Sequence, residues 1–130
     1  MACASPFTEE QTRAIEGGIS KQERIVMASA GTGKTGVIAE IKRRLGKACM
    51  VVTPTHKTAL VLMDRGVQDV HLIKGLTSNK FTQRKVFENN VTHLIVDEAG
   101  MVSAKDITII EGWIKENVHQ PLHIMYFGDP

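Results

Sequence analysis

The sequence predicts an α/β fold with a mostly parallel sheet and helices on both faces of it. Two observations lead to this prediction. Short apolar runs of strand length alternate with amphipathic stretches of helix length along the chain. The run at residues 48–53 is also continuously apolar, which suits a parallel strand buried on both faces. Right-handed crossovers between the strands are therefore expected.

The composition is that of one soluble globular domain spanning residues 1–130, because 42% of the residues are hydrophobic and 23% are charged. A net charge of +2 is too small to indicate nucleic-acid binding by itself. No apolar run is long enough for a membrane span, and the N-terminus lacks the apolar core of a signal peptide. The two cysteines have no partners at metal-binding spacing, so a reducing, cytoplasmic setting is expected.

The N-terminal helix is predicted to begin after Thr8 and to end at Gly17-Gly18. Gln11 stands three residues after Thr8, as in a capping box. Gln11 has a second interpretation, in which its amide hydrogen-bonds an adenine edge. The residue pattern alone favours the cap.

The strongest local signal is a glycine-rich turn, ASAGTGKT at residues 28–35, between a strand at 24–27 and a helix at 36–45. Gly31 and Gly33 let the backbone approach an oxyanion closely at a helix N-terminus. Lys34 adds a positive charge for the β- and γ-phosphates, and the Thr35 hydroxyl suits Mg²⁺. Ala28 replaces the first glycine of the usual pattern. Val37, Ile38, Ile41 and Leu45 are predicted to form the apolar face of the helix, with Lys42, Arg43 and Arg44 mostly off it.

Residues 48–53 form the next predicted strand, followed by Thr53, Pro54, Thr55 and His56 and then by a helix that closes at Gly66. Ligands of open α/β sheets bind beyond the carboxyl ends of the strands, where small hydroxyls suit phosphate or sugar contacts. A threonine–proline loop with a helix cap explains the same residues equally well.

The segment from 67 to 92 is predicted to hold a short strand within 67–73, a loop at 74–79 and a short helix at 81–88 before a turn at Asn89-Asn90. A basic cluster formed by Lys74, Lys80, Arg84 and Lys85 is either solvated surface or a nucleic-acid contact.

An apolar strand at 93–96 ends in two adjacent carboxylates, Asp97 and Glu98. The first suits Mg²⁺, and the second can orient and deprotonate an attacking water. Adjacent strand residues face opposite ways, so the strand must turn for both to act. A helix-capping acidic pair is the alternative, and the phosphate loop upstream favours the metal-and-water interpretation.

The last predicted elements are a helix at 103–118 and a buried strand at 122–127, followed by Gly128-Asp129-Pro130. The helix is predicted to bury an apolar stripe of Ile107, Ile110, Trp113 and Ile114.

Taken together, the motifs resemble the first RecA-like domain of superfamily 1 DNA helicases, in the RecD/Dda-like branch that moves 5′ to 3′. The resemblance covers nearly the whole chain and rests on five stretches in order: FTEEQ, ASAGTGKT, VVTPTHKTA, LIVDEAGMVS and IMYFGDP. It implies a P-loop NTPase fold, ATP and Mg²⁺ as ligands, and single-stranded DNA as a partner, with other replication or recombination proteins as further partners.

The resemblance also implies roles for individual residues. Lys34 and Glu98 would be catalytic, with Glu98 as the general base, and Thr35 and Asp97 would hold Mg²⁺. The nucleotide would be bound by Gln11, Ala30, Gly31, Thr32, Gly33, Lys34, Thr35, Gly128 and Asp129, and the DNA backbone by Thr53, Pro54, Thr55 and His56.

Three departures from the branch are visible. Gly100 stands where serine is common, a threonine–isoleucine–histidine element is not clear at residues 72–76, and the glutamine expected just after Asp129 lies beyond the sequence. The resemblance further implies that the second RecA-like domain is missing from this chain, so that the chain alone hydrolyses ATP poorly. Two other classes remain open: a small-molecule kinase acting on nucleosides, and a non-catalytic nucleotide-binding or interaction module.

Overall fold

The computed structural model describes residues 7–20, 25–27 and 33–128, and these form a five-stranded sheet in the order β1-β5-β4-β2-β3. Every strand pair is parallel, which confirms the predicted sheet. The strands are β1 (Ile25–Met27), β2 (Cys49–Thr53), β3 (Val70–Leu72), β4 (His93–Val96) and β5 (His123–Gly128).

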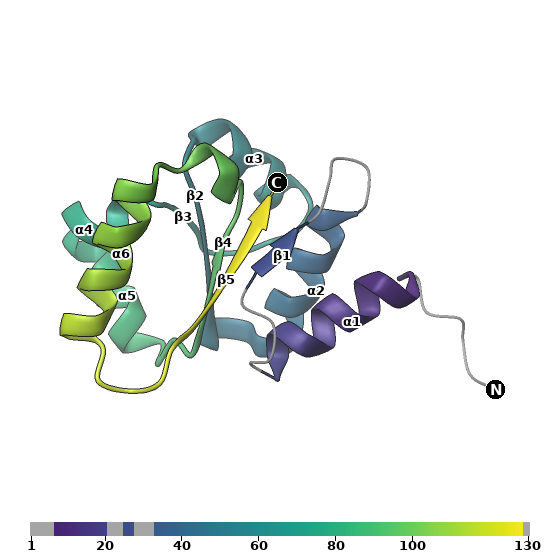
Figure 1. The fold of residues 1–130 in the computed structure, drawn as a ribbon, viewed down its shortest axis with the longest axis horizontal. Helices are drawn as coiled ribbons and strands as arrows, with labels where there is room; N and C mark the ends of the chain where they lie inside the picture. Colours follow the sequence, from purple (N-terminus) through teal and green to yellow (C-terminus); the bar gives the residue numbers. More distant parts are fainter. Residues whose placement is uncertain (1–6, 21–24, 28–32, 129–130) are drawn as a thin grey trace.

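Helices cover both faces of the sheet, as Figure 1 shows, with α1 and α2 on one side and α4, α5 and α6 on the other. The helices are α1 (Glu9–Ile19), α2 (Lys34–Leu45), α3 (His56–Asp64), α4 (Gly75–Ser78), α5 (Lys80–Glu88) and α6 (Ala104–Asn117), with short 3₁₀ turns η1 (Gly46–Ala48) and η2 (Ala99–Met101). No helix among the described residues has the length and apolar character needed to cross a bilayer.

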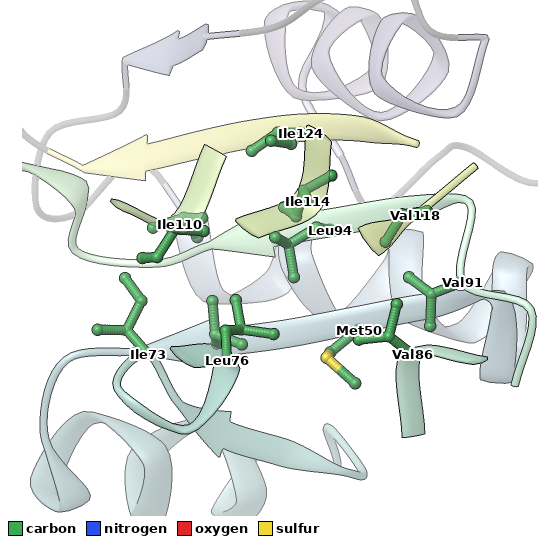
Figure 2. Close-up of a cluster of buried hydrophobic side chains, with 12 residues drawn as sticks. Met50, Ile73, Leu76, Val86, Val91, Leu94, Ile110, Ile114, Val118 and Ile124 are labelled. Carbon is green, nitrogen blue, oxygen red and sulfur yellow. The ribbon is translucent and has the colours of Figure 1, made fainter. Parts of the chain in front are cut away.

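Alternate residues of the central strands point into two separate cores. Met50, Leu94 and Ile124 pack against α6 through Ile110 and Ile114, and Figure 2 shows this cluster. The opposite face carries the second core, in which the strand residues Val51, Ile95, Met125 and Phe127 meet Ile15, Val37, Ile38, Ile41 and Leu62. Burial on both faces explains the continuous apolar run of β2, whose five residues are all buried.

The end of α1 differs from the prediction. The helix runs through Gly17 and Gly18 to Ile19, and both glycines are buried. A Cβ placed on Gly18 would lie 2.5 Å from the sulfur of Met125, so the glycine lets α1 approach β5 closely. This packing overrides the helix-ending tendency of the glycine pair.

In α2 the helix begins two residues earlier than expected, at Lys34, and Lys42 is buried although it was predicted to lie off the apolar face. The Lys42 ammonium donates hydrogen bonds to the carbonyls of Gly46 (2.9 Å) and Cys49 (2.6 Å). It thereby caps the helix end and the start of β2 with one side chain, while its methylene stem packs inside.

Residues 74–79 were predicted to be a loop, and this prediction is wrong for its central part, which forms α4. Gly75 packs tightly against Thr82 of α5, with only 2.8 Å between a Cβ placed on the glycine and the threonine hydroxyl. Buried Leu76 fixes this short helix against the core. The remaining predicted strands and helices are present, with ends that differ by a few residues at most.

Candidate functional site

The candidate site lies where three neighbouring strands end. In the sheet β5 lies between β1 and β4, so Met27, Gly128 and Val96 are brought to one edge. The α2 N-terminus, with Gly33 as its cap residue, carries Lys34 and Thr35 at the same edge (Figure 1). This is the position at which open parallel sheets bind ligands.

Lys34 bridges the two predicted carboxylates. Its ammonium lies 3.0 Å from Oδ1 of Asp97 and 2.5 Å from Oε1 of Glu98. Burial alone would lower the pKa of Lys34, but the hydrogen bonds and charges of Glu98 and Asp97 outweigh it and raise the pKa above its ordinary value. Lys34 is therefore a firmly charged ammonium held beside two acids.

Asp97 is a buried carboxylate with only 3% of its surface exposed. Its backbone N–H donates to the carbonyl of Val52, which fixes its position beyond β4. Oδ1 lies 3.0 Å from the Lys34 ammonium and has no other polar partner among the described residues. Burial raises the pKa of this carboxyl group, and the Lys34 ammonium opposes the rise.

This environment of Asp97 suits a divalent cation. A buried carboxylate oxygen whose one polar partner is a mobile lysine can accept a metal ion, and Thr35 is available at the same helix terminus. Among the described residues no group of three or more His, Cys, Asp or Glu side chains could hold a metal. Mg²⁺ usually takes one or two protein ligands and completes its shell with phosphate oxygens and water. The residues present therefore fit Mg²⁺ bound together with a nucleotide.

Glu98 makes the turn that the sequence required. Its backbone is left-handed (φ 53°, ψ 43°), which redirects the chain directly after Asp97. Such a conformation costs a non-glycine residue roughly 1–2 kcal/mol, and surrounding contacts must hold it. The carbonyl of Glu98 accepts a hydrogen bond from the N–H of Met101 at 2.9 Å. As a result both carboxylates reach Lys34.

Gln11 fulfils its predicted capping role and also lies beside the candidate site. Its Oε1 accepts from the N–H of Thr8 at 2.9 Å, and the Thr8 hydroxyl accepts from the N–H of Gln11 at 3.1 Å. A Cβ placed on Gly33 would lie 2.3 Å from Nε2 of Gln11, so the amide rests directly on the residue that caps α2. The capping box is therefore confirmed, and adenine recognition stays a prediction supported by this position.

Gly128 is buried at the end of β5 and packs against η2, immediately after Glu98. Its predicted direct contact with the nucleotide stays a prediction. Four further predicted nucleotide-binding residues, Ala30, Gly31, Thr32 and Asp129, lie outside the described residues.

The Thr-Pro-Thr-His stretch is divided by the fold. Thr53 is fully buried, and its hydroxyl shares a hydrogen bond with the hydroxyl of Thr58. Thr55 caps α3 by accepting from the N–H of Thr58 at 3.3 Å. Pro54 is half-buried and His56 is exposed. The cap interpretation is thus confirmed for Thr55, the Thr53 side chain is buried, and the DNA-backbone contacts of these four residues stay a prediction.

A groove of about 540 Å³ lies beside His56, between α3, the edge strand β3 and the α4–α5 pair. Its rim carries Lys74 and a phenylalanine, Phe81, that is 62% exposed. The ammonium of Lys85 lies 5.3 Å from the centre of the Phe81 ring, and the His71 ring lies 6.5 Å from it. Sequence reasoning missed Phe81 as a surface residue, although its neighbours in the basic cluster were a signal for it.

Comparisons with known proteins agree with this geometry. The family described as an AAA domain matches residues 6–130. The Pif1 protein of Bacteroides sp in complex with ADP-AlF4 has a TM-score of 0.75 and 22% identity, over 97% of this chain and 33% of that chain. A structure that describes DNA unwinding at forked double-stranded DNA by two Pif1 helicases has a TM-score of 0.70 and 24% identity. The match covers 96% of this chain and 34% of that chain.

A hypothetical ATP-dependent RNA helicase from Sulfolobus tokodaii gives a TM-score of 0.69 and 20% identity, over 97% of this chain and 46% of that chain. No curated protein matches the chain. The chain thus spans about a third to a half of the length of these solved structures. It belongs to the AAA domain family and has the RecA-like fold of the corresponding part of Pif1 helicases.

Proposed function

We propose that this chain is the ATP-binding half of an ATP-dependent DNA helicase that moves 5′ to 3′ along single-stranded DNA. The observation that carries the proposal is the position of Lys34 between Asp97 and Glu98 at the shared edge of three strands. A lysine at a helix N-terminus opposite a buried carboxylate is the arrangement that phosphate-loop enzymes use for nucleotide phosphates.

ATP binding would exchange the partners of Lys34. Without nucleotide, the ammonium is paired with two carboxylates. The β- and γ-phosphates are stronger competitors for it, because they carry more charge and approach along the α2 dipole. Thr35 and Asp97 would hold Mg²⁺, which neutralises phosphate charge when it is bound.

Glu98 is the proposed general base. Its side chain is 29% exposed, in contrast to the buried side chain of Asp97, so water can reach it. Release of Lys34 to the phosphates would leave the Glu98 carboxylate free to orient a water molecule and accept its proton.

Single-stranded DNA is the proposed track. The exposed His56, the groove rim at Lys74 and the exposed Phe81 lie together beyond β2 and β3. A positive rim attracts phosphates, and an exposed aromatic ring accepts a stacked base of any identity. The solved Pif1 structure that describes DNA unwinding at forked double-stranded DNA supports DNA as the substrate.

A second RecA-like domain would complete the motor. An arginine supplied across the nucleotide cleft is worth roughly 10³–10⁵ in rate, and translocation needs two domains that open and close. We therefore expect this chain alone to bind ATP and to hydrolyse it slowly. Replication or recombination proteins are its proposed further partners. A cytoplasmic setting is also proposed, and the free thiol of buried Cys49 agrees with a reducing compartment.

The test is steady-state ATP hydrolysis with Mg²⁺, with and without single-stranded DNA, beside Lys34→Ala and the exposed-lysine control Lys47→Ala. We expect the unmodified chain and Lys47→Ala to bind ATP in the presence of Mg²⁺ and to hydrolyse it slowly. Lys34→Ala should bind ATP at least tenfold more weakly. Equal nucleotide binding by both variants would exclude the proposed site, and robust unwinding by this chain alone would contradict its role as half a motor. A single-stranded RNA of the same length tests the DNA preference.

A further inference from the structure

The end of β5 and the 3₁₀ turn η2 are in unusually close contact at Gly128. A Cβ placed on Gly128 would lie 3.0 Å from the backbone nitrogen of Ala99, 3.3 Å from that of Gly100 and 3.5 Å from the carbonyl carbon of Glu98. All three atoms belong to the backbone, which cannot rotate away as a flexible side chain can. The glycine therefore leaves room for the turn that follows Glu98.

The turn that Gly128 supports holds a strained residue. Glu98 has φ 53° and is one of three non-glycine residues with a positive φ in the described part of the chain. Two hydrogen bonds close η2: Met101 N–H to Glu98, and Val102 N–H to Ala99 at 3.1 Å. A strained residue persists only where its surroundings fix it, and here the backbone of η2 packs directly against Gly128.

Gly128 is tied to the other side of the site as well. Its register partner in β1 is Met27, the last residue of the strand that leads to the phosphate loop. The same residue thus borders the strand before the phosphate loop and the turn that carries Glu98. Its own φ of 158° lies where side chains are seldom accommodated, so a substitution strains the backbone of Gly128 and presses on η2.

We propose that Gly128 is a positioning residue for hydrolysis: the missing side chain lets η2 dock on β5, and this docking aims the Glu98 carboxylate at Lys34. This inference rests on the proposed function of Glu98 as general base. It assigns to Gly128 an action through the backbone of residues 98–100, in place of a direct contact with nucleotide.

The contact is tested first in the unmodified chain by NMR, without nucleotide. Nuclear Overhauser effects between the α-protons of Gly128 and the amide protons of Ala99 and Gly100 are expected, together with an HN–Hα coupling of Glu98 that fits a left-handed backbone. Absence of these signals in the folded chain would overturn the inference, whatever the chain does with ATP.

Gly128→Ala then tests the consequence, with Gly112→Ala as the matched control. Gly112 lies in α6, and a Cβ there would meet nothing within 4 Å. We expect Gly128→Ala to fold, to shift the amide signals of residues 98–101 and to lower kcat about tenfold, since misplacement by 1 Å can cost about 10². The dissociation constant for ATP should stay within about twofold of the unmodified value. Gly112→Ala should change neither quantity.

A double variant separates positioning from a general loss of structure. If Gly128 acts through Glu98, adding Gly128→Ala to Glu98→Gln should lower kcat no further. Additive losses, an unchanged kcat in Gly128→Ala, or a Gly128→Ala chain that does not fold would each overturn the inference. Failure of the proposed function is distinct, because the unmodified chain would then neither bind ATP nor hydrolyse it.

Discussion

The ammonium of Lys34 lies 2.5 Å from the carboxylate of Glu98 although 64 residues separate them in the chain. Lys34 begins α2, and Glu98 follows β4, two strands away from β1 across the sheet. In this arrangement the residue proposed to bind phosphate also neutralises the residue proposed to activate water. Nucleotide binding would therefore release the base at the moment when its substrate arrives.

The Glu98→Gln variant should separate nucleotide binding from hydrolysis. Glutamine keeps the size and the left-handed turn but cannot accept a proton, so kcat should fall by about 10²–10⁴. The affinity for ATP should stay the same or rise, because Lys34 loses one competing carboxylate. Single-turnover hydrolysis and equilibrium binding of a fluorescent ATP analogue measure the two effects. A large loss of affinity would show that Glu98 contributes to binding instead.

The Asp97→Asn variant should change the dependence of stability on pH. Burial raises the pKa of Asp97, so folding favours the protonated carboxyl, and its stabilising effect is complete below the ordinary value of 3.8. As the pH rises through the raised pKa, the folded protein must hold a buried carboxylate and loses that stability. Asparagine does not ionise, so the stability of the variant relative to the unmodified chain should rise between pH 4 and pH 8.

Urea unfolding of both proteins over that pH range measures this difference. The same variant should lose the extra stability that Mg²⁺ with an ATP analogue confers on the unmodified chain, because one proposed ligand is gone. A constant difference in stability at all pH values would mean that Asp97 titrates alike in the folded and unfolded states.

Replacing Lys42 by methionine should destabilise the fold. Methionine retains the apolar stem, but the carbonyls of Gly46 and Cys49 lose the ammonium donor. The loss should be about 1–3 kcal/mol, the usual cost of leaving a buried acceptor such as the Cys49 carbonyl without its partner. Urea unfolding provides the measurement, and the exposed Lys47→Met provides the control. A Lys42→Met chain as stable as this control would show that water replaces the ammonium fully.

Cys49 should be inert toward thiol reagents in the folded chain. It is 1% exposed, and burial raises its pKa to about 12, with the Lys42 charge opposing the rise. Only about one thiol in 10⁴ is then ionised at pH 8, and the thiolate is the reactive form. A Cys3→Ser variant isolates Cys49 for reaction with a coloured disulfide reagent. Rapid labelling before urea is added would contradict the burial of this strand.

The sequence alone determined the parallel sheet, because each strand carries its own apolar run and each helix its own period. It also determined the local signals: the capping box of Thr8 and Gln11, and the adjacent acids at residues 97–98. The expected turn at the end of the strand followed from local geometry too, since neighbouring strand residues face opposite ways, and the structure places this turn at Glu98. These predictions succeeded because their causes lie within a few residues of each other.

Tertiary structure decided what depends on contacts between distant segments. Helix α1 continues through Gly17-Gly18 because Gly18 packs closely against Met125 of β5. Lys42 is buried because its ammonium donates hydrogen bonds to two backbone carbonyls. The hydroxyl of Thr53 shares a hydrogen bond with that of Thr58 and is buried, so it is not accessible at the surface. Most of all, the strand order β1-β5-β4 brings Lys34, Gly128 and Glu98 together. Strand order is fixed by how the two cores pack, and no local pattern of residues contains that information.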